Sequence, residues 1–136
     1  MITIYFKRRL KQHSLGPYMN MLHKAIIVIE VNALRLSFNM TFLDCASALF
    51  YSVIKLALDT PHNSPAELRA SAALVIRKWK KLLKGYITSA DEEIEVILKF
   101  EEMCLEYKEL APSFTQIIHL MYDEDLVQEG VDSKMG

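Results

Sequence analysis

Residues 90–109 read ADEEIEVILKFEEMCLEYKE, and this stretch decides the fold that we predict. Its apolar side chains recur at helical spacing on two adjoining faces, namely Ile94, Ile97, Leu98 and Leu105 on one and Val96, Phe100, Met103 and Tyr107 on the other. Acidic residues cover the remaining face, at Glu95, Glu102, Glu106 and Glu109. Carboxylates at this density repel one another by about a few tenths of a kcal/mol per pair in an isolated helix. We therefore predict an amphipathic helix whose acids are offset by a neighbouring helix or by a partner.

The composition indicates a single all-α domain. The chain has 136 residues, of which 51% are hydrophobic, and only four glycines and four prolines. A chain of this length buries roughly 70% of the surface that its unfolded form exposes, which is enough for a core. Few glycines and prolines favour long helices over many short strands.

Helix starts and stops divide the chain into five predicted helices, at residues 20–38, 42–59, 65–84, 90–109 and 113–127. Four starts resemble capping boxes, in which a hydroxyl is followed three residues later by an acid or amide, at Thr41 and Asp44, Ser64 and Glu67, Ser89 and Glu92, and Ser113 and Gln116. Short connections between such helices predict antiparallel hairpins, stacked as a solenoid or packed as an irregular bundle. We assign residues 20–129 to this domain, 1–19 to a basic segment and 130–136 to a divergent tail.

Charge is distributed unevenly along the chain. Residues 1–24 hold five basic residues and no acid, whereas residues 91–125 hold eleven acids against two lysines. The acidic half should repel nucleic acid and attract lysine-rich segments. Two interpretations stay open, because the predicted third helix carries a basic face to which the antiparallel fourth helix could present its acids, above all those from Asp91 to Glu95. This basic face is formed by Arg77, Lys80, Lys81 and Lys84. Surface ion pairs contribute only about 0–1 kcal/mol each, so pairing alone would not explain so many acids.

The sequence argues against covalent or metal chemistry. The four histidines are scattered without a second ligand at helical spacing, and no phosphate-binding glycine loop or nucleophile motif is present. We expect no metal and no cofactor. Cys45 and Cys104 lie on apolar helical patterns, which suits buried reduced thiols in the cytosol. No apolar run is long enough to span a membrane. Nucleic-acid binding through Lys7 to Lys11 would be salt-sensitive and blind to sequence.

A single carboxylate, Glu30, interrupts an apolar helix that reads IIVIEVNALRL over residues 26–36. One interpretation is a surface ion pair with Arg35. The other is a carboxylate offered to a charged site on another protein. Trp79, between two lysines, is most simply a core anchor.

Three segments carry a resemblance to a known family. The resemblance is to the carboxy-terminal catalytic domain of the epsilon subunit of translation initiation factor 2B, and the sequence is most similar to plant members. The segments that resemble it are residues 29–40 (IEVNALRLSFNM), residues 59–64 (DTPHNS) and the acidic run from Asp91 to Glu106. The resemblance covers roughly residues 26–129. It implies a HEAT-like all-helical domain of the two-tryptophan type, with two acidic-aromatic boxes.

The resemblance implies guanine-nucleotide exchange on translation initiation factor 2. Its exchange motif matches Ile29, Glu30, Asn32 and Arg35, with Glu30 as the essential residue. Its first acidic-aromatic box matches Asp91, Glu92, Glu93, Glu95, Phe100, Glu101 and Glu102. The implied partners are the G domain of the gamma subunit, lysine-rich segments of the beta subunit and other exchange-factor subunits, with no specific nucleic acid and no membrane. The alternative is a binding module that docks lysine-rich segments without catalysis.

The second acidic-aromatic box begins at Tyr122, Asp123, Glu124 and Asp125. In the family this box continues to a tryptophan and further closing helices, whereas here the sequence diverges after Glu129. We therefore expect a truncated copy without its C-terminal capping helices, with exchange weakened or lost. A solenoid without its end cap leaves apolar side chains exposed. The residues expected to lack partners are Ile117, Ile118, Leu120, Met121 and Leu126.

Overall fold

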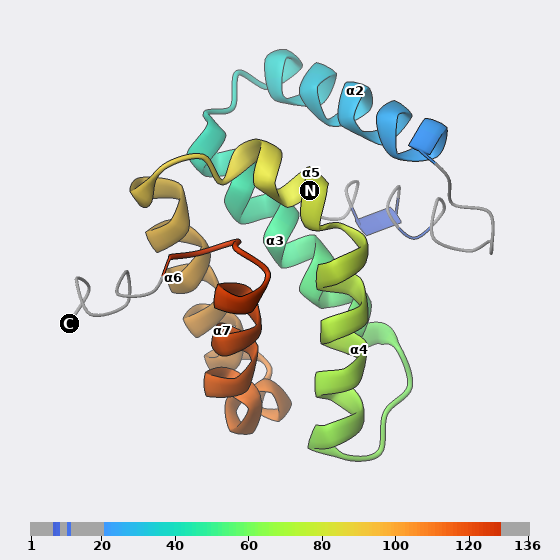
Figure 1. The fold of residues 1–136 in the computed structure, drawn as a ribbon, viewed down its shortest axis with the longest axis vertical. Coiled ribbons are helices and arrows are strands. Elements are labelled where there is room, and N and C mark those ends of the chain that lie inside the picture. The colour runs from blue at the N-terminus through green and yellow to red at the C-terminus, as the bar shows by residue number, and fades with distance from the viewer. Residues whose placement is uncertain (1–6, 9–10, 12–20, 129–136) are drawn as a thin grey trace.

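Helices account for all the regular structure in the part of the chain that the computed structural model describes, residues 7, 8, 11 and 21–128. The α-helices are α2 (Met21–Ser37), α3 (Phe42–Asp59), α4 (Pro65–Lys78), α5 (Lys80–Tyr86), α6 (Ala90–Glu106) and α7 (Phe114–Asp123), with a 3₁₀ helix η1 (Lys108–Ser113) before α7. Figure 1 shows α3 and α4 running in opposite directions, as do α6 and α7. The all-α prediction is confirmed, whereas stacking as a HEAT-like solenoid remains a prediction.

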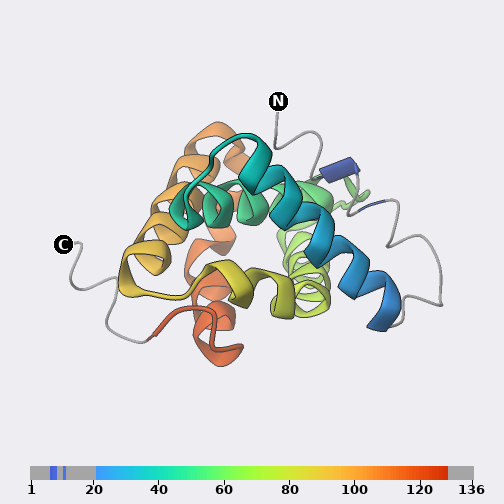
Figure 2. The same ribbon diagram turned by 90° about the horizontal axis from the view of Figure 1, so that it is seen from above.

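The core is built around α3, whose inner side is packed from Cys45 to Leu58. Helices α4 and α6 both pack against α3, and α7 packs against α4 and α6. Helix α2 crosses one end of this assembly, as Figure 2 shows from above. Its inner side reaches the core through Ile27 and Val31, which are both buried. Ile27 and Val31, one helical turn apart, therefore face the core, while the opposite side of α2 is exposed to solvent.

The predicted helix 65–84 is interrupted at Trp79. The backbone of this residue leaves the helical region (φ −102°, ψ 11°), and its indole ring is buried in the core. Hydrogen bonds continue on both sides of the break, from the Trp79 N–H to Val75 O and from the Leu83 N–H to Trp79 O. The interpretation of Trp79 as a core anchor is confirmed. The change of direction at this anchor lets α5 approach α2.

The predicted helices 90–109 and 113–127 both end earlier than expected. After Glu106 the chain tightens into η1, which contains Pro112. Helix α7 stops at Asp123 because Asp125 adopts a left-handed conformation (φ 59°) and the Leu126 N–H bonds to Met121 O at 2.9 Å. Asn39 (φ 53°) ends α2 in the same way. Left-handed cap residues other than glycine are hard to recognise in a sequence.

Two of the four predicted capping boxes cap their helices. Thr41 Oγ1 accepts from the Asp44 N–H at 3.1 Å, and Asp44 accepts from the Thr41 N–H, as predicted. Ser64 Oγ accepts from the Glu67 N–H at 3.2 Å, although the Glu67 carboxylate reaches the N–H of Asn63 instead of Ser64.

The other two boxes were predicted wrongly. Ser89 makes no cap hydrogen bond; its hydroxyl donates to Glu92 Oε2 at 2.8 Å, while Glu92 Oε1 accepts from the Thr88 hydroxyl at 2.8 Å. Ser113 occupies the N-cap position of α7, but its side chain makes no cap hydrogen bond either; the residue is buried and is the last of η1. Spacing alone therefore does not say which hydroxyl faces a free backbone N–H.

The prediction that the C-terminal apolar residues lack partners is wrong within the described residues. Helix α7 lies on α4 and α6, and the turn after it folds back onto the core. Leu120 packs against the core, and the remaining residues are buried, namely Ile117, Ile118, Met121 and Leu126. Val127, at the end of the turn, is buried as well. The hairpin formed by α6 and α7 thus closes this side of the domain.

His62 joins the loop before α4 to η1, and the raised pKa of its ring predicts a pH-dependent stability. Its Nδ1 lies 2.8 Å from Thr60 O and its Nε2 lies 2.8 Å from Glu109 Oε2, with Glu67 also acting on the ring. Hydrogen bonds to the Thr60 carbonyl and the Glu109 carboxylate raise the pKa of His62 above its ordinary 6.5. This contribution is complete below the ordinary value and disappears as the pH rises through the raised pKa of the folded state.

We expect the free energy of unfolding to fall between about pH 6 and about pH 9 by an amount that the His62→Gln substitution removes. Urea denaturation at both pH values measures it. His119→Gln, which replaces an exposed histidine of α7, is the control. An equal pH dependence in wild type and His62→Gln would contradict this assignment.

Candidate protein-interaction surfaces

The predicted exchange motif lies on the outer side of α2. Ile27 and Val31 point into the core, so helical periodicity turns the residues between them outward. Ile29 is 69% exposed, Asn32 is exposed, and Glu30 is partly exposed beside them. A partner can therefore reach the carboxylate and the isoleucine together.

Arg35 connects α2 to the start of α3. Its guanidinium donates to Asn32 Oδ1 through Nε at 3.1 Å and Nη2 at 3.0 Å, and it lies over the Phe42 ring, 4.9 Å from the centroid. Phe42 in turn contacts Tyr86 of α5, with ring centroids 5.3 Å apart. These contacts fix the Asn32 and Arg35 side chains relative to each other. The two motif residues thus form one polar pair on α2.

An apolar groove runs between α2 and α5 next to this motif. It encloses about 370 Å³ and is lined by both motif and non-motif residues. Ile29 and Asn32 line it from α2, and Leu82 and Tyr86 line it from α5. Sequence reasoning missed this groove, because it depends on the break at Trp79 that directs α5 toward α2.

The residues matched to the first acidic-aromatic box are divided between surface and interior. Asp91, Glu101 and Glu102 are exposed, and Glu92 and Glu95 are partly exposed. Glu93 is only 8% exposed, and its Oε1 accepts from the Gln128 N–H at 2.7 Å, which ties α6 to the end of the described chain. Hydrogen bonds from Ser89 and Thr88 lower the pKa of Glu92 below its usual range. Because Glu93 is buried and accepts a hydrogen bond from the Gln128 N–H, its carboxylate stabilises the fold.

Phe100 also belongs to the interior. It is 0% exposed, stacks on Phe114 with centroids 5.4 Å apart, and meets the edge of Phe50 at 5.9 Å. The apolar residues among the exposed acids of α6 are instead Leu98 and Leu105, which are 44% and 82% exposed. Their spacing of seven residues, on either side of Glu101 and Glu102, places them on one face of the helix.

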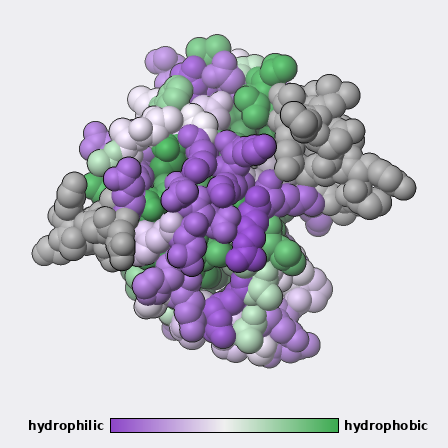
Figure 3. Space-filling view, viewed as in Figure 1, coloured by the Kyte–Doolittle hydropathy of each residue, from purple (hydrophilic) through white to green (hydrophobic). Residues whose placement is uncertain are grey.

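The basic face of the predicted third helix pairs with the end of α7. Glu124 Oε2 lies 3.5 Å from Arg77 Nε, and Glu124 Oε1 lies 3.4 Å from Lys80 Nζ. Hydrophilic side chains cover the middle of this face of the molecule, over α4 and α7 (Figure 3). Glu102 pairs within its own helix, with Lys99 at 3.4 Å. Among the described residues, this basic face thus pairs with Glu124 at the end of α7, and not with the acids from Asp91 to Glu95 of α6 that we expected as its partners.

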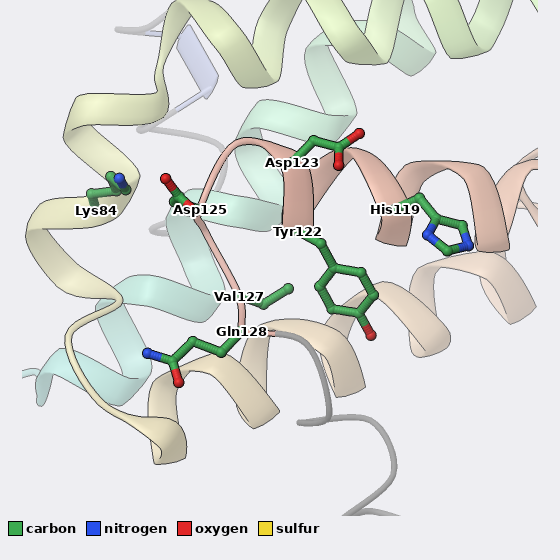
Figure 4. A pocket seen from close by; sticks show the side chains of 7 residues that line it. All are labelled: Lys84, His119, Tyr122, Asp123, Asp125, Val127 and Gln128. Carbon is green, nitrogen blue, oxygen red and sulfur yellow. The ribbon is translucent and has the colours of Figure 1, made fainter.

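Residues matched to the second acidic-aromatic box line a polar pocket of about 640 Å³ between α5 and the end of α7. Tyr122, Asp123 and Asp125 contribute to it, and Lys84 and His119 complete its polar lining. Figure 4 shows the Lys84 and Asp125 side chains facing each other at one end, with His119 at the other. The pocket therefore contains charges of both signs.

Neither thiol has the character of a nucleophile. Both cysteines are free and buried, and burial raises the pKa of Cys45 to about 12 and that of Cys104 to about 11. Within residues 7, 8, 11 and 21–128, no group of three or more histidine, cysteine or acidic side chains is placed to hold a metal ion. Every described helix is too short or too polar to cross a lipid bilayer.

Comparison with known proteins gives a distant relation. No protein-family model matches the chain. Over 107 residues the chain is 25% identical to a protein of Dictyostelium discoideum named translation initiation factor eIF2B subunit epsilon. The aligned part covers 76% of this chain but only 15% of that relative, so the chain spans a small part of its length. The chain is therefore a distant relative of the epsilon subunit of initiation factor 2B.

Proposed function

We propose that this chain acts on translation initiation factor 2 and accelerates the release of GDP from it. The distant relation to the epsilon subunit of initiation factor 2B supports a link to this exchange reaction. The observation that carries the proposal is the exposure of these residues on α2, where Ile29 and Asn32 are exposed and Glu30 is partly exposed on a helix anchored by two buried residues. In this proposal the G domain of the gamma subunit binds to that side.

Exchange by this route needs no covalent step. A protein that binds the nucleotide-free G domain more tightly than the GDP-bound form weakens GDP binding by the same factor. The Glu30 carboxylate would supply part of this difference by competing for a lysine or a magnesium site that GDP otherwise occupies. Ile29, which is more exposed than Glu30, would add apolar contact.

The direct test measures the release of a fluorescent GDP analogue from purified initiation factor 2, with and without the chain. Release that accelerates with chain concentration and saturates supports exchange. An unchanged release rate at concentrations where the two proteins bind each other would reject exchange and leave the binding-only function. Absence of binding would reject both.

The second candidate function is docking of lysine-rich segments without catalysis. The exposed acids of α6 favour it, because Asp91, Glu101 and Glu102 are accessible and lie on the same helix as the exposed Leu98 and Leu105. Opposite charges attract a basic segment, and the leucines can cover its apolar side chains. In this candidate function, the chain binds the lysine-rich beta subunit of the same factor.

We expect the double substitution Glu101→Gln with Glu102→Gln to weaken binding of a lysine-rich peptide by about 1.4- to 5-fold for each charge removed, because exposed charge pairs contribute about 0.2–1 kcal/mol. Fluorescence anisotropy at low and high salt measures the affinity, and the difference should shrink at high salt. Glu124→Gln is the matched control, since its carboxylate already pairs with Arg77 and Lys80. Equal losses in the control and the double variant would contradict docking at α6.

A further inference from the structure

The groove between α2 and α5 has the chemistry of a binding site for an apolar side chain. Its outer walls include Val28, Ile29 and Phe42, large hydrophobic residues that remain 40–69% exposed. Its deeper wall is formed by Leu82 and Tyr86, which are buried. Green, hydrophobic side chains also appear along the top of Figure 3, where α2 runs in Figure 1. Contiguous exposed apolar surface of this kind marks interaction sites.

One charge borders this apolar surface. Lys81 lines the groove from α5 and is exposed. Among the described residues it makes no ion pair, in contrast to Lys80 beside it, which pairs with Glu124. A segment that enters the groove therefore gains from carrying a negative charge next to its apolar side chain.

We propose that the α2–α5 groove is an anchor site for a protein segment that inserts one bulky apolar side chain and places a carboxylate on Lys81. The volume of about 370 Å³ lies in the range of pockets that hold a bound group. Because Ile29 and Asn32 belong to both the groove and the proposed exchange motif, the identity of the partner rests on the proposed function. The chemistry of the site, an apolar groove with one lysine, does not depend on the proposed function.

Gly85 offers a way to close the groove without disturbing the core. It lies in the groove lining and is exposed, and a Cβ atom added to it would meet no other atom within 4 Å. A phenylalanine at this position therefore extends into the space that the partner side chain would occupy. Gly85→Ala adds only a methyl group and is the matched control for the change of backbone freedom in the helix.

The probe is a synthetic peptide with one phenylalanine followed by two glutamates, titrated into the ¹⁵N-labelled chain and followed by NMR. We expect saturable shifts of amide signals in residues 28–32 and 81–86. Gly85→Phe should weaken binding at least about tenfold, because it removes the burial of the inserted ring. Lys81→Gln should weaken it about 1.4- to 5-fold. A peptide with lysines in place of the glutamates should bind less tightly than the acidic peptide.

Several outcomes would overturn the proposal. These are shifts outside the groove, equal affinity in wild type and Gly85→Phe, equal affinity for the basic peptide, or dilution-dependent shifts without peptide, which would show that a second copy of the chain fills the groove. Unchanged spectra outside α2 and α5 establish that Gly85→Phe is folded. The peptide assay contains no initiation factor, so its result is independent of the GDP-release assay. The peptide can fail to bind while GDP release is accelerated, and it can bind while GDP release is unchanged.

Discussion

Replacement of Phe100 by alanine is expected to lower the free energy of unfolding by about 3–5 kcal/mol, which is a large share of the roughly 5–15 kcal/mol typical of a domain. The ring is completely buried between Phe50 of α3 and Phe114 of α7. Its removal leaves a cavity at the junction of three helices and takes away two aromatic contacts. The loss of stability should therefore exceed that of any surface substitution proposed above.

Urea denaturation followed by circular dichroism measures this loss. Leu105→Ala is the matched control, because it truncates an apolar side chain of the same helix that is 82% exposed, and its effect should stay within about 0.5 kcal/mol. Binding of a lysine-rich peptide to Phe100→Ala, measured where the variant is still folded, should be unchanged. A stable Phe100→Ala protein that no longer binds the peptide would place the ring on the docking surface instead.

The helical type of the described segments and the starts of α2, α3, α4, α6 and α7 to within about one residue could be predicted from the sequence, because apolar periodicity and turn residues act locally. Thr41 and Asp44 are an example, since both partners of the box lie within one turn. The break at Trp79 could not be predicted in this way. It is set by burial of the indole in a core formed by distant helices, and neither glycine nor proline marks it in the sequence.

The division of α6 into a buried and an exposed side was only half predictable. Its apolar residues occupy two adjoining faces, and periodicity alone does not show which face turns to the core. The structure buries Val96, Phe100 and Met103 and exposes Leu98 and Leu105. The choice follows from the aromatic residues of α3 and α7, which receive Phe100, and these contacts join residues far apart in the chain.

The roles of individual acids depend on long-range partners for the same reason. Glu93 accepts from a backbone N–H 35 residues later, at Gln128, and Glu124 pairs with Arg77 of α4 and Lys80 of α5. Sequence spacing could only propose that some acids pair inside the molecule. The structure identifies these two, and it leaves Asp91 and Glu101 exposed for a partner.

The second large effect is expected on exchange. Glu30→Gln should reduce the acceleration of GDP release from initiation factor 2 by about 5- to 150-fold, the range of a coupling free energy of about 1–3 kcal/mol. The amide keeps the size of the side chain and removes only its negative charge, so the loss reports on the charge that competes with GDP. Because Glu30 is partly exposed on α2, the fold should be retained.

Glu30→Asp and Glu109→Gln provide the comparison in the same fluorescent GDP assay. Aspartate keeps the charge on a shorter side chain and should retain part of the acceleration, whereas Glu109→Gln removes an acid of η1 and should leave it unchanged. Equal acceleration by wild type and Glu30→Gln would show that the carboxylate is not the exchange residue. Equal losses in Glu30→Gln and Glu109→Gln, with full acceleration retained by Glu30→Asp, would instead indicate a general dependence on negative charge, which belongs to docking of a basic partner and not to displacement of GDP.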